Sequence, residues 1–273
     1  LVGVKEAFQS FLTPESKAYQ YLLDRGLSPE SIKQYQIGYS PSHFDAQKLM
    51  LNNGAEKDVV KQSGIFFQRD DGSLHSRFKN RIIFPILDYQ SRISGFSGRI
   101  FETDDKKIAK YLNSEENPVF NKRQLLYGLN NAKKSIKELG FVILMEGFMD
   151  VIVSNQYGFE NAIGTMGTAL TSTHAKKIKR FTSKVYLAMD SDQAGQQAID
   201  RCDEVLKREN ITTYVIKMDD KDPADTLLNF GKESFQKLID NPLPMIRYKL
   251  GKAIELNSLD NIEEVSEILS QLV

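Results

Sequence analysis

The sequence predicts an α/β protein, α+β in overall composition, built from three successive parts. Three observations predict this class: helical spacing of apolar residues near the start, short strand patterns later in the first half, and strand–helix alternation from Phe141 onward. The expected parts are a mixed α+β basic subdomain at 1–130, a parallel-sheet α/β subdomain at 131–241 and a helical subdomain at 242–273, expected to be truncated.

The first forty residues are expected to be largely helical. Apolar side chains recur at helical spacing from Ser16 to Arg25, and Gly26 suits the position after a helix end. Ser28 followed by Pro29 is typical of a helix N-cap with proline at the first helical position. A helix that begins at Pro29 is therefore predicted.

Short strands are predicted next, at 64–67, 81–87 and 93–100. Polar turns such as Asp70-Asp71-Gly72 separate them, and residues 102–110 are polar enough to form an exposed loop.

Basic residues are concentrated in this region. The whole chain is neutral, yet His75 to Lys137 holds 13 lysine and arginine residues against 6 aspartate and glutamate residues. Arg77, Lys79 and Arg81 alternate along a strand-like stretch, so their side chains are expected on one face. Such a distribution suits a lobe that binds a polyanion, although solvated surface charges would give the same counts.

Strands and helices alternate from Phe141. Strands are predicted at 141–145, 162–166, 185–189 and 212–218, with helices at 148–156, 171–181 and 193–208 between them. This order predicts a parallel sheet covered by helices, in which the loop after every strand lies on one edge. Beyond Pro244 the pattern becomes helical, with apolar positions at Ile246, Leu250, Ile254, Val265, Ile268, Leu269 and Leu272.

Composition limits the protein class. The chain has 273 residues, of which 41% are apolar and 26% charged, as in ordinary globular proteins. No apolar run approaches the roughly eighteen residues of a membrane helix, and no signal-peptide pattern opens the sequence, so we expect a cytoplasmic protein without a membrane partner. The single cysteine, Cys202, excludes an internal disulfide and a cysteine-based zinc site. His43, His75 and His174 show no ligand spacing and are expected to be surface or loop residues.

Acidic residues follow three of the predicted strands. Glu146 follows the first, with Asp150 one helical turn later, and Asp190 and Asp192 follow the third. Asp219, Asp220, Asp222 and Asp225 follow the fourth. Carboxylates that meet on one edge repel one another unless divalent cations neutralise them, and Mg²⁺ suits such oxygen ligands. Helix capping explains single members of this set equally well.

Several motifs resemble a known family. Glu146-Gly147-Phe148-Met149-Asp150-Val151, the stretch 164–171 (GTMGTALT) and Asp190-Ser191-Asp192-Gln193-Ala194-Gly195 resemble the TOPRIM domain in its bacterial primase form. Primases, topoisomerases and some nucleases share TOPRIM domains. The segments 21–27, 37–41, 77–86, 95–99, 110–114, 120–122 and 126–129 are similar to the polymerase core of DnaG-type primases. The resemblance covers nearly the whole chain.

The resemblance implies a DNA-dependent RNA polymerase that makes short RNA primers from NTPs on single-stranded DNA in the bacterial replisome. It implies catalytic roles for Glu146, Asp190 and Asp192, and a Mg²⁺ site, with Mn²⁺ as a substitute, formed by these three together with Asp222, Asp150 and Asp225. No zinc is expected in this chain. Ala224 departs from the family pattern Asp-Pro-Asp, which leaves open whether Asp225 replaces the second carboxylate.

The resemblance also implies partners and alternatives. Nucleotide or template contacts fall on Arg77, Asn80, Arg81, Arg99, Lys110, Tyr111 and Lys122, and Tyr111 is a candidate for stacking on a base. Full-length primases of this type carry a zinc domain and a domain that contacts the replicative helicase, so this chain is expected to be a core fragment. The alternatives are another TOPRIM enzyme, such as a topoisomerase or nuclease, and a non-catalytic nucleic-acid-binding module.

Overall fold

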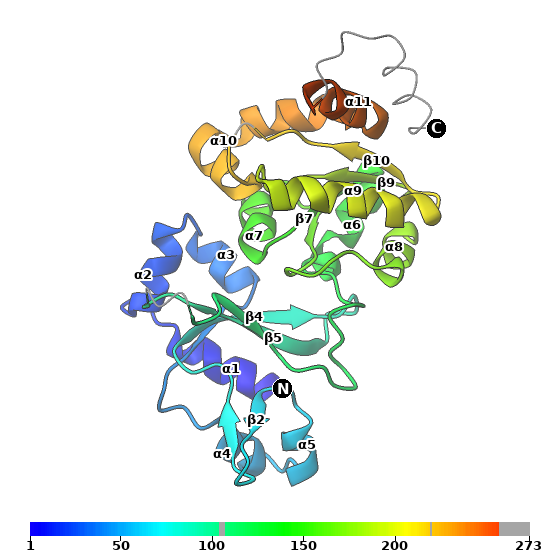
Figure 1. Cartoon of the computed structure of the whole chain (residues 1–273). Helices are drawn as coiled ribbons and strands as arrows, with labels where there is room; N and C mark the ends of the chain where they lie inside the picture. Colours follow the sequence, from blue (N-terminus) through cyan, green and yellow to red (C-terminus); the bar gives the residue numbers. More distant parts are fainter. Residues whose placement is uncertain (104–106, 219, 257–273) are drawn as a thin grey trace.

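The computed structural model describes residues 1–103, 107–218 and 220–256. Its chain forms two stacked lobes, each organised around one sheet (Figure 1). We call residues 1–128 the antiparallel lobe and residues 129–256 the parallel lobe.

The antiparallel lobe is built on a four-stranded sheet. Its strands are β1 (Gly38–Ser40), β4 (Arg81–Leu87), β5 (Ile93–Ile100) and β6 (Tyr111–Asn113), in the order β1-β4-β5-β6. Every neighbouring pair is antiparallel. The ranges of β4 and β5 agree with the sequence prediction.

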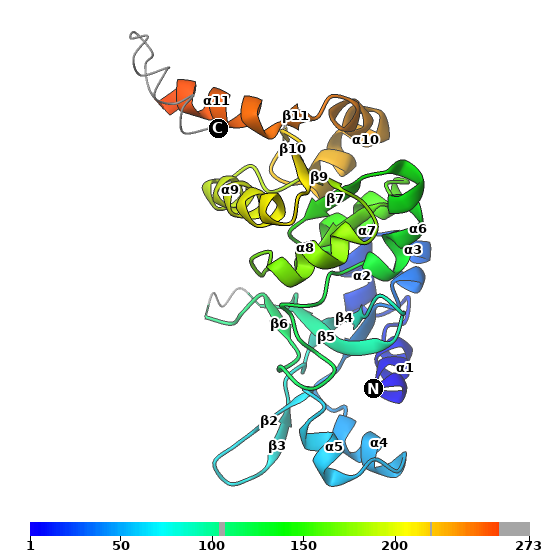
Figure 2. The same cartoon turned by 90° about the vertical axis from the view of Figure 1, so that its right-hand side faces the viewer.

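Helices cover this sheet and extend the lobe. They are α1 (Val2–Phe11), α2 (Lys17–Asp24) and α3 (Pro29–Gln34) beside the sheet, and α4 (Ala46–Asn52) and α5 (Lys57–Lys61) farther out. The Ser28 hydroxyl caps α3 by accepting the Ser31 N–H at 3.1 Å, which confirms the predicted helix start. A hairpin of β2 (Phe66–Gln68) and β3 (Leu74–Ser76) lies with α4 and α5 at the end of the molecule far from the parallel lobe (Figure 2).

The prediction that Arg77, Lys79 and Arg81 share one face of a strand is wrong. Residues 77–80 form a turn between β3 and β4, and Asn80 adopts a left-handed backbone with φ of 54°. Lys79 is therefore exposed while Arg81, the first residue of β4, is buried. Alternation of residue types cannot distinguish an extended strand from a turn that joins two strands.

The parallel lobe confirms the predicted parallel sheet. The strands β7 (Val142–Met145), β8 (Ala162–Gly164), β9 (Lys184–Leu187) and β10 (Thr212–Val215) run parallel in the order β10-β9-β7-β8. A short strand, β11 (Leu243–Pro244), pairs antiparallel with β10 and was not expected. The helices are α6 (Leu129–Leu139), α7 (Phe148–Gln156), α8 (Ser172–Lys179), α9 (Gln193–Arg208), α10 (Pro223–Asp240) and α11 (Met245–Leu256).

The C-terminal prediction is testable only in part. Helix α11 includes the predicted positions Ile246, Leu250 and Ile254. Val265, Ile268, Leu269 and Leu272 lie outside the described residues. None of the described helices is long and apolar enough to span a membrane.

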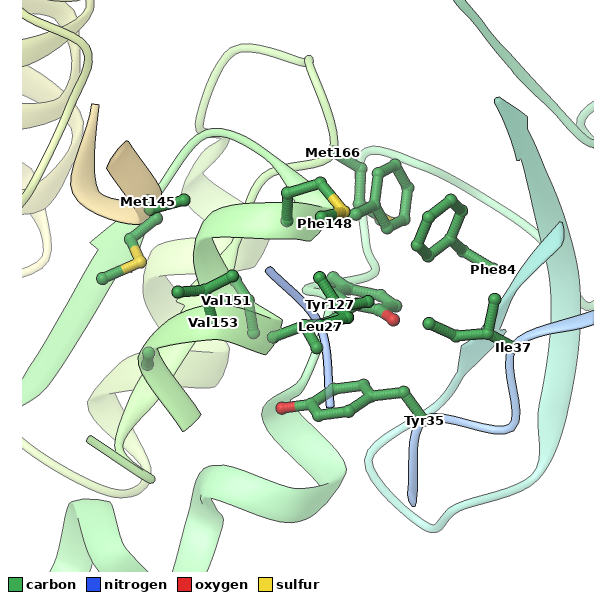
Figure 3. Packing of buried hydrophobic residues seen from close by; sticks show 14 of the residues in the cluster. Leu27, Tyr35, Ile37, Phe84, Tyr127, Met145, Phe148, Val151, Val153 and Met166 are labelled. Atoms are coloured by element: carbon green, nitrogen blue, oxygen red, sulfur yellow. The ribbon is translucent and has the colours of Figure 1, made fainter. Parts of the chain in front are cut away.

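One hydrophobic core joins the two lobes. Leu27, Tyr35 and Ile37 of the antiparallel lobe converge with Tyr127 and with Phe148 of α7 (Figure 3). The Tyr127 and Phe148 rings meet edge to face at 4.6 Å between centroids. Tyr127 and Gly164 also exchange two backbone hydrogen bonds, of 2.9 and 3.0 Å. Because close-packed side chains resist displacement, this core fixes how the two lobes face each other.

Candidate active site at the acidic sheet edge

A cavity of about 250 Å³ lies where the strand ends of the parallel lobe face the antiparallel lobe. Four carboxylates line it, and we call them the acidic edge: Glu146, Asp150, Asp190 and Asp222. Three cations of the antiparallel lobe line it too, and we call them the basic wall: Arg25, Arg99 and Lys110. Lys221, beside Asp222, also lines the cavity. Residues more than one hundred positions apart therefore meet at one site.

Glu146 and Asp190 are brought together by strand pairing. Glu146 follows the last residue of β7, and Asp190 lies three residues beyond the end of the neighbouring parallel strand β9. The Ala188 N–H donates to the Leu144 carbonyl at 2.9 Å, which extends this pairing toward Asp190. Parallel neighbours place their carboxyl ends on the same edge, so these two carboxylates share one cavity.

Gly195 allows the turn that carries Asp190. A Cβ atom at this position would lie 2.1 Å from the Asp190 carbonyl oxygen and 2.8 Å from its carbonyl carbon. Only glycine permits the first turn of α9 to approach the Asp190 backbone so closely. This contact is the physical reason for the spacing of Gly195 after Asp190.

Asp192 and Asp222 both cap helices. Asp192 Oδ1 accepts the Gly195 N–H at 2.8 Å at the start of α9, and Asp222 Oδ1 accepts the Asp225 N–H at 2.7 Å at the start of α10. Each cap uses one carboxylate oxygen, so capping does not prevent ligand binding through Oδ2. Asp222 lines the cavity, whereas Asp192 is exposed and is not part of the lining.

Asp150 is buried and connects two parts of the acidic edge. Its Oδ2 accepts the Gly147 N–H at 3.1 Å and its Oδ1 accepts the Ala224 N–H at 3.3 Å. Burial, followed by the negative charges of Asp222 and Asp190, raises the pKa of Asp150 to about 7. The geometry favours Asp150 as the residue that holds the start of α10 against the turn after β7.

The other members of the acidic edge also resist ionisation. Burial, with added repulsion from Glu146 and Asp222, raises the pKa of Asp190 to about 6. Burial likewise raises the pKa values of Glu146 and Asp222. Glu146 Oε1 is a buried atom without a hydrogen-bond partner. A bound cation would relieve both the mutual repulsion and this unsatisfied oxygen, so the donor set fits a divalent metal.

The carboxylates do not form a closed metal cage. Within the described part of the chain, no group of three or more Asp, Glu, His or Cys side chains has the geometry to hold a metal ion alone. Mg²⁺ is commonly bound by one or two carboxylates together with waters and substrate phosphates. The open arrangement therefore agrees with a cation that binds together with a phosphorylated substrate.

The remaining acidic candidates are not in the cavity lining. Asp225 donates its backbone N–H to Asp222 and lies in the first turn of α10. Asp220 accepts a hydrogen bond from the Asn229 amide at 2.7 Å, which turns it toward α10. Asp219 lies outside the described residues. The lining gives no support for Asp225 as a substitute for the carboxylate missing at Ala224.

Arg99 is held in the basic wall by two tyrosines. Its Nε donates to Tyr21 Oη at 3.0 Å, and its Nη1 donates to Tyr111 Oη at 2.6 Å. The Tyr111 ring also stacks on Phe148 at 5.5 Å. Tyr111 therefore positions Arg99 and itself lines the cavity, and its stacking on a base stays a prediction. Tyr21, which sequence reasoning did not single out, has the same role.

The predicted basic residues outside the basic wall have other surroundings. Arg81 is buried, and its Nη1 donates to the carbonyls of Gly98, Ala109 and Lys110 at 3.0, 2.9 and 3.4 Å. Arg81 thus positions the backbone that carries Lys110. Arg77 forms an ion pair with Glu115 at 3.7 Å, and the exposed Asn80 lies in a turn.

Lys122 lies in a loop that helix α8 holds in place. Three consecutive carbonyls, at positions 122, 123 and 124, accept hydrogen bonds from His174 at 3.0 Å, from Thr171 at 2.7 Å, and from Lys177. The donors are spaced by three residues, so they share one helix face. His174 is fully buried here, which makes the surface prediction for it wrong.

Sequence reasoning also missed Arg25 and Lys221. Arg25 follows α2 in a segment without a strand-end signal, so only the tertiary structure reveals that it lines the cavity. Lys221 lies among the aspartates after the fourth strand, where the same strand-end argument applies. Met166 lines the cavity with a left-handed backbone at φ of 60°, which is rare for a side-chain-bearing residue and typical of functional loops.

Family comparisons agree with this arrangement of two lobes. Residues 7–133 match the family model described as the N-terminal domain of the DNA primase catalytic core, and residues 143–227 match a Toprim-like model. A crystal structure of a DNA primase domain from Pseudomonas aeruginosa is 30% identical, with a TM-score of 0.85 over 98% of this chain and 85% of that chain. The chain belongs to the DnaG-type DNA primase family.

Other primases are similar over nearly the whole chain. The DNA primase of Clostridium acetobutylicum is 36% identical over 96% of this chain and 44% of the relative. A DnaG primase catalytic domain bound to ssDNA has a TM-score of 0.82 and 29% identity over 96% of this chain and 84% of that chain. The chain spans less than half the length of the curated primases that it matches.

Proposed function

We propose that this chain is the RNA-polymerising core of a DNA primase, which makes short RNA primers from NTPs on single-stranded DNA. The observation that carries the proposal is the cavity in which the acidic edge faces the basic wall. Nucleotidyl transfer needs both, because carboxylates suit a divalent cation and arginine and lysine suit the phosphates of an NTP. The bound single strand of the similar DnaG domain supports the choice of template.

In the proposed reaction, the oxygen of a 3′-hydroxyl group forms a bond to the α-phosphorus of an NTP. The bond from this phosphorus to the bridging oxygen of the β-phosphate breaks, pyrophosphate leaves, and the hydroxyl proton passes to a carboxylate or to water. Glu146 is within the cavity and suits either the role of base or that of metal ligand.

Glu146, Asp190 and Asp222 are the proposed ligands of Mg²⁺, which Mn²⁺ would replace. The exposed Asp192, which caps α9 two residues after Asp190, is a further proposed ligand. A bound divalent cation lowers the pKa of the attacking hydroxyl and neutralises phosphate charge. Asp150 positions the ligand-bearing segments through its two backbone hydrogen bonds.

Arg25, Arg99 and Lys110 are the proposed contacts to the triphosphate, because they line the wall opposite the carboxylates. Lys122 and Arg77 lie outside this cavity and are proposed contacts to the template strand. The proposed place of action is the replication fork in the bacterial cytoplasm.

The proposal is tested by primer synthesis on single-stranded DNA with Glu146→Gln and Asp190→Asn proteins. We expect each change to lower the rate by on the order of 100-fold or more, since each removes a charge from the reacting site. Glu6→Gln and Asp58→Asn make the same chemical changes at exposed positions of α1 and α5 and should leave the rate unchanged. Undiminished synthesis by both site variants would refute the assignment.

The same proteins separate the alternatives. NTP-independent cleavage of DNA that disappears in Asp190→Asn would indicate a topoisomerase- or nuclease-like enzyme. Tight binding of single-stranded DNA without synthesis or cleavage would indicate a non-catalytic module.

A further inference from the structure

Lys221 belongs to a different lobe from the other cations that line the cavity. Arg25, Arg99 and Lys110 reach the cavity from the antiparallel lobe, whereas Lys221 belongs to the segment that carries Asp222. Its side chain lines the same cavity as Asp190 and Asp222. None of the ion pairs in the described part of the chain includes Lys221.

The backbone of Lys221 is fixed between the acidic residues. Its carbonyl accepts the Ser191 N–H at 2.8 Å and the Ser191 hydroxyl at 3.2 Å, and Ser191 lies between Asp190 and Asp192. Its own N–H donates to Asp220 Oδ1 at 2.7 Å. The loop after β10 is thereby tied to the loop after β9, so the backbone that carries Lys221 is fixed beside the acidic edge, and its side chain lines the cavity.

The charge balance of the acidic edge makes this position consequential. Ala224 lines the cavity beside Asp222 without adding a charge, and the acidic Asp225 lies in the same first turn of α10. Lys221, which lines the cavity with Asp190 and Asp222, reduces the negative potential of the acidic edge. A divalent cation without nucleotide is attracted by that potential, whereas the phosphates of a nucleotide are attracted by the ammonium group.

We propose that Lys221 is a built-in counter-cation of the acidic edge, which weakens binding of a bare divalent cation and strengthens binding of nucleotide phosphates. The cation then binds mainly together with the nucleotide, because the phosphates add the negative charge that Lys221 offsets at the acidic edge. This inference depends on the proposed function for the identity of the ligands, and it names a residue that helps to select the metal–nucleotide complex over the free metal.

The experiment measures Mn²⁺ binding to the full chain without nucleotide, by calorimetry or by the loss of the free-ion EPR signal. Lys221→Gln is expected to bind Mn²⁺ roughly three- to tenfold more tightly than the unchanged chain, and added salt should reduce the difference. In a second titration, Lys221→Gln should bind ATP several-fold more weakly than the unchanged chain does.

Two control variants make the result specific. Lys237→Gln removes an exposed lysine of α10 that lines neither this cavity nor the second cavity that Asp190 lines, so both affinities should stay unchanged. Lys221→Arg keeps the charge and should retain the original Mn²⁺ affinity. Damage to the fold would weaken the binding of both Mn²⁺ and ATP. Tighter Mn²⁺ binding together with weaker ATP binding therefore identifies an electrostatic effect.

The outcomes separate this inference from the proposed function. If the unchanged chain shows no Mn²⁺ binding that Asp190→Asn abolishes, the metal site of the proposed function fails. If that binding exists and Lys221→Gln leaves it unchanged or weakens it, the counter-cation role of Lys221 is overturned. Unchanged ATP affinity in Lys221→Gln would overturn the phosphate contact.

Discussion

The acidic edge and the basic wall face each other across one cavity, yet they are assembled in different ways. Glu146 and Asp190 follow neighbouring parallel strands of one sheet, so chain direction alone places them together. Arg25 follows α2, Arg99 lies in β5, and Lys110 precedes β6. Only the packing of two lobes brings these three cations to the carboxylates.

This difference explains which site residues were identifiable in advance. The resemblance and the strand ends pointed to every carboxylate of the acidic edge, whereas two of the cavity cations, Arg25 and Lys221, were missed. Arg81 was predicted to contact nucleotide or template, which stays a prediction; in the structure its guanidinium group donates to the carbonyls of Gly98, Ala109 and Lys110. A charge in the sequence does not reveal whether its side chain points to solvent, to a cavity or to a carbonyl group.

The largest effect is expected from a substitution that displaces the backbone of Asp190 in the acidic edge. Gly195→Ala places a Cβ atom 2.1 Å from the Asp190 carbonyl oxygen, so the turn must shift. We expect the free energy of unfolding to fall by roughly 4 kcal/mol, measured by urea denaturation. Gln197→Ala, at an exposed position of the same helix, is the control and should change stability little. A loss below about 1 kcal/mol would show that the turn adapts easily.

A second prediction concerns the loop at residues 122–124, which we call the basic loop, and its connection to the parallel lobe. The Nδ1 atom of His174 accepts the Thr171 N–H and its Nε2 lies 3.0 Å from the Lys122 carbonyl, so the ring is neutral with its proton on Nε2. Burial lowers the pKa of His174 to about 4, whereas an unfolded histidine titrates near 6.5. Between these pH values the unfolded chain binds more protons, so acidification from about pH 6.5 toward 4 destabilises the fold.

The loss from His174 should reach roughly 3 kcal/mol at the acidic end of this range. His174→Gln removes the titration, so the stability advantage of the unchanged chain should be greatest above pH 7 and disappear near pH 4. Urea denaturation of both proteins across this range gives the difference. Because Asp150 and Asp190 have raised pKa values and act in the opposite direction in both proteins, only the difference is diagnostic. Parallel pH profiles would contradict the buried neutral ring.

A third prediction compares two arginines. Arg81→Met leaves the carbonyls of Gly98 and Ala109 without their buried guanidinium donor. It should lower the free energy of unfolding, measured by urea denaturation, by about 2 kcal/mol. Arg92→Met removes an ion pair with Asp88 in which the arginine side chain is 73% exposed, and it should lower the free energy of unfolding by less than about 0.5 kcal/mol. Equal stability of both variants would mean that Arg81 is not a structural residue, and its predicted nucleotide contact would regain support.

The smallest effect tests the N-terminus of α8. The Thr171 hydroxyl accepts the His174 N–H at 3.2 Å and donates to the Arg123 carbonyl at 2.7 Å. Thr171→Val should lower the free energy of unfolding by about 1 kcal/mol and weaken binding of single-stranded DNA, because the basic loop loses an anchor. Thr173→Val makes the same change at an exposed position of the same helix, and both readouts should stay near the original values.

Much of the fold followed from local patterns. The predicted ranges of β4, β5, α7 and α9 agree with the structure, because each has a clear periodicity and a clear boundary. The basic strand at 77–81 and the surface position of His174 were wrong, since a turn and a buried polar residue depend on partners far away in the sequence. Strand β11 has only two residues and exists through its pairing with β10.

The sequence by itself determined the parallel sheet, the chain direction through it and the acidic residues that follow its strands. These features are local, because strand and helix periodicity and the order of elements along the chain specify them. The tertiary structure decided which cations face the carboxylates, which arginines are buried and which helix holds the basic loop. Side chains far apart in the chain meet only when two lobes share one core, and no local pattern encodes that packing.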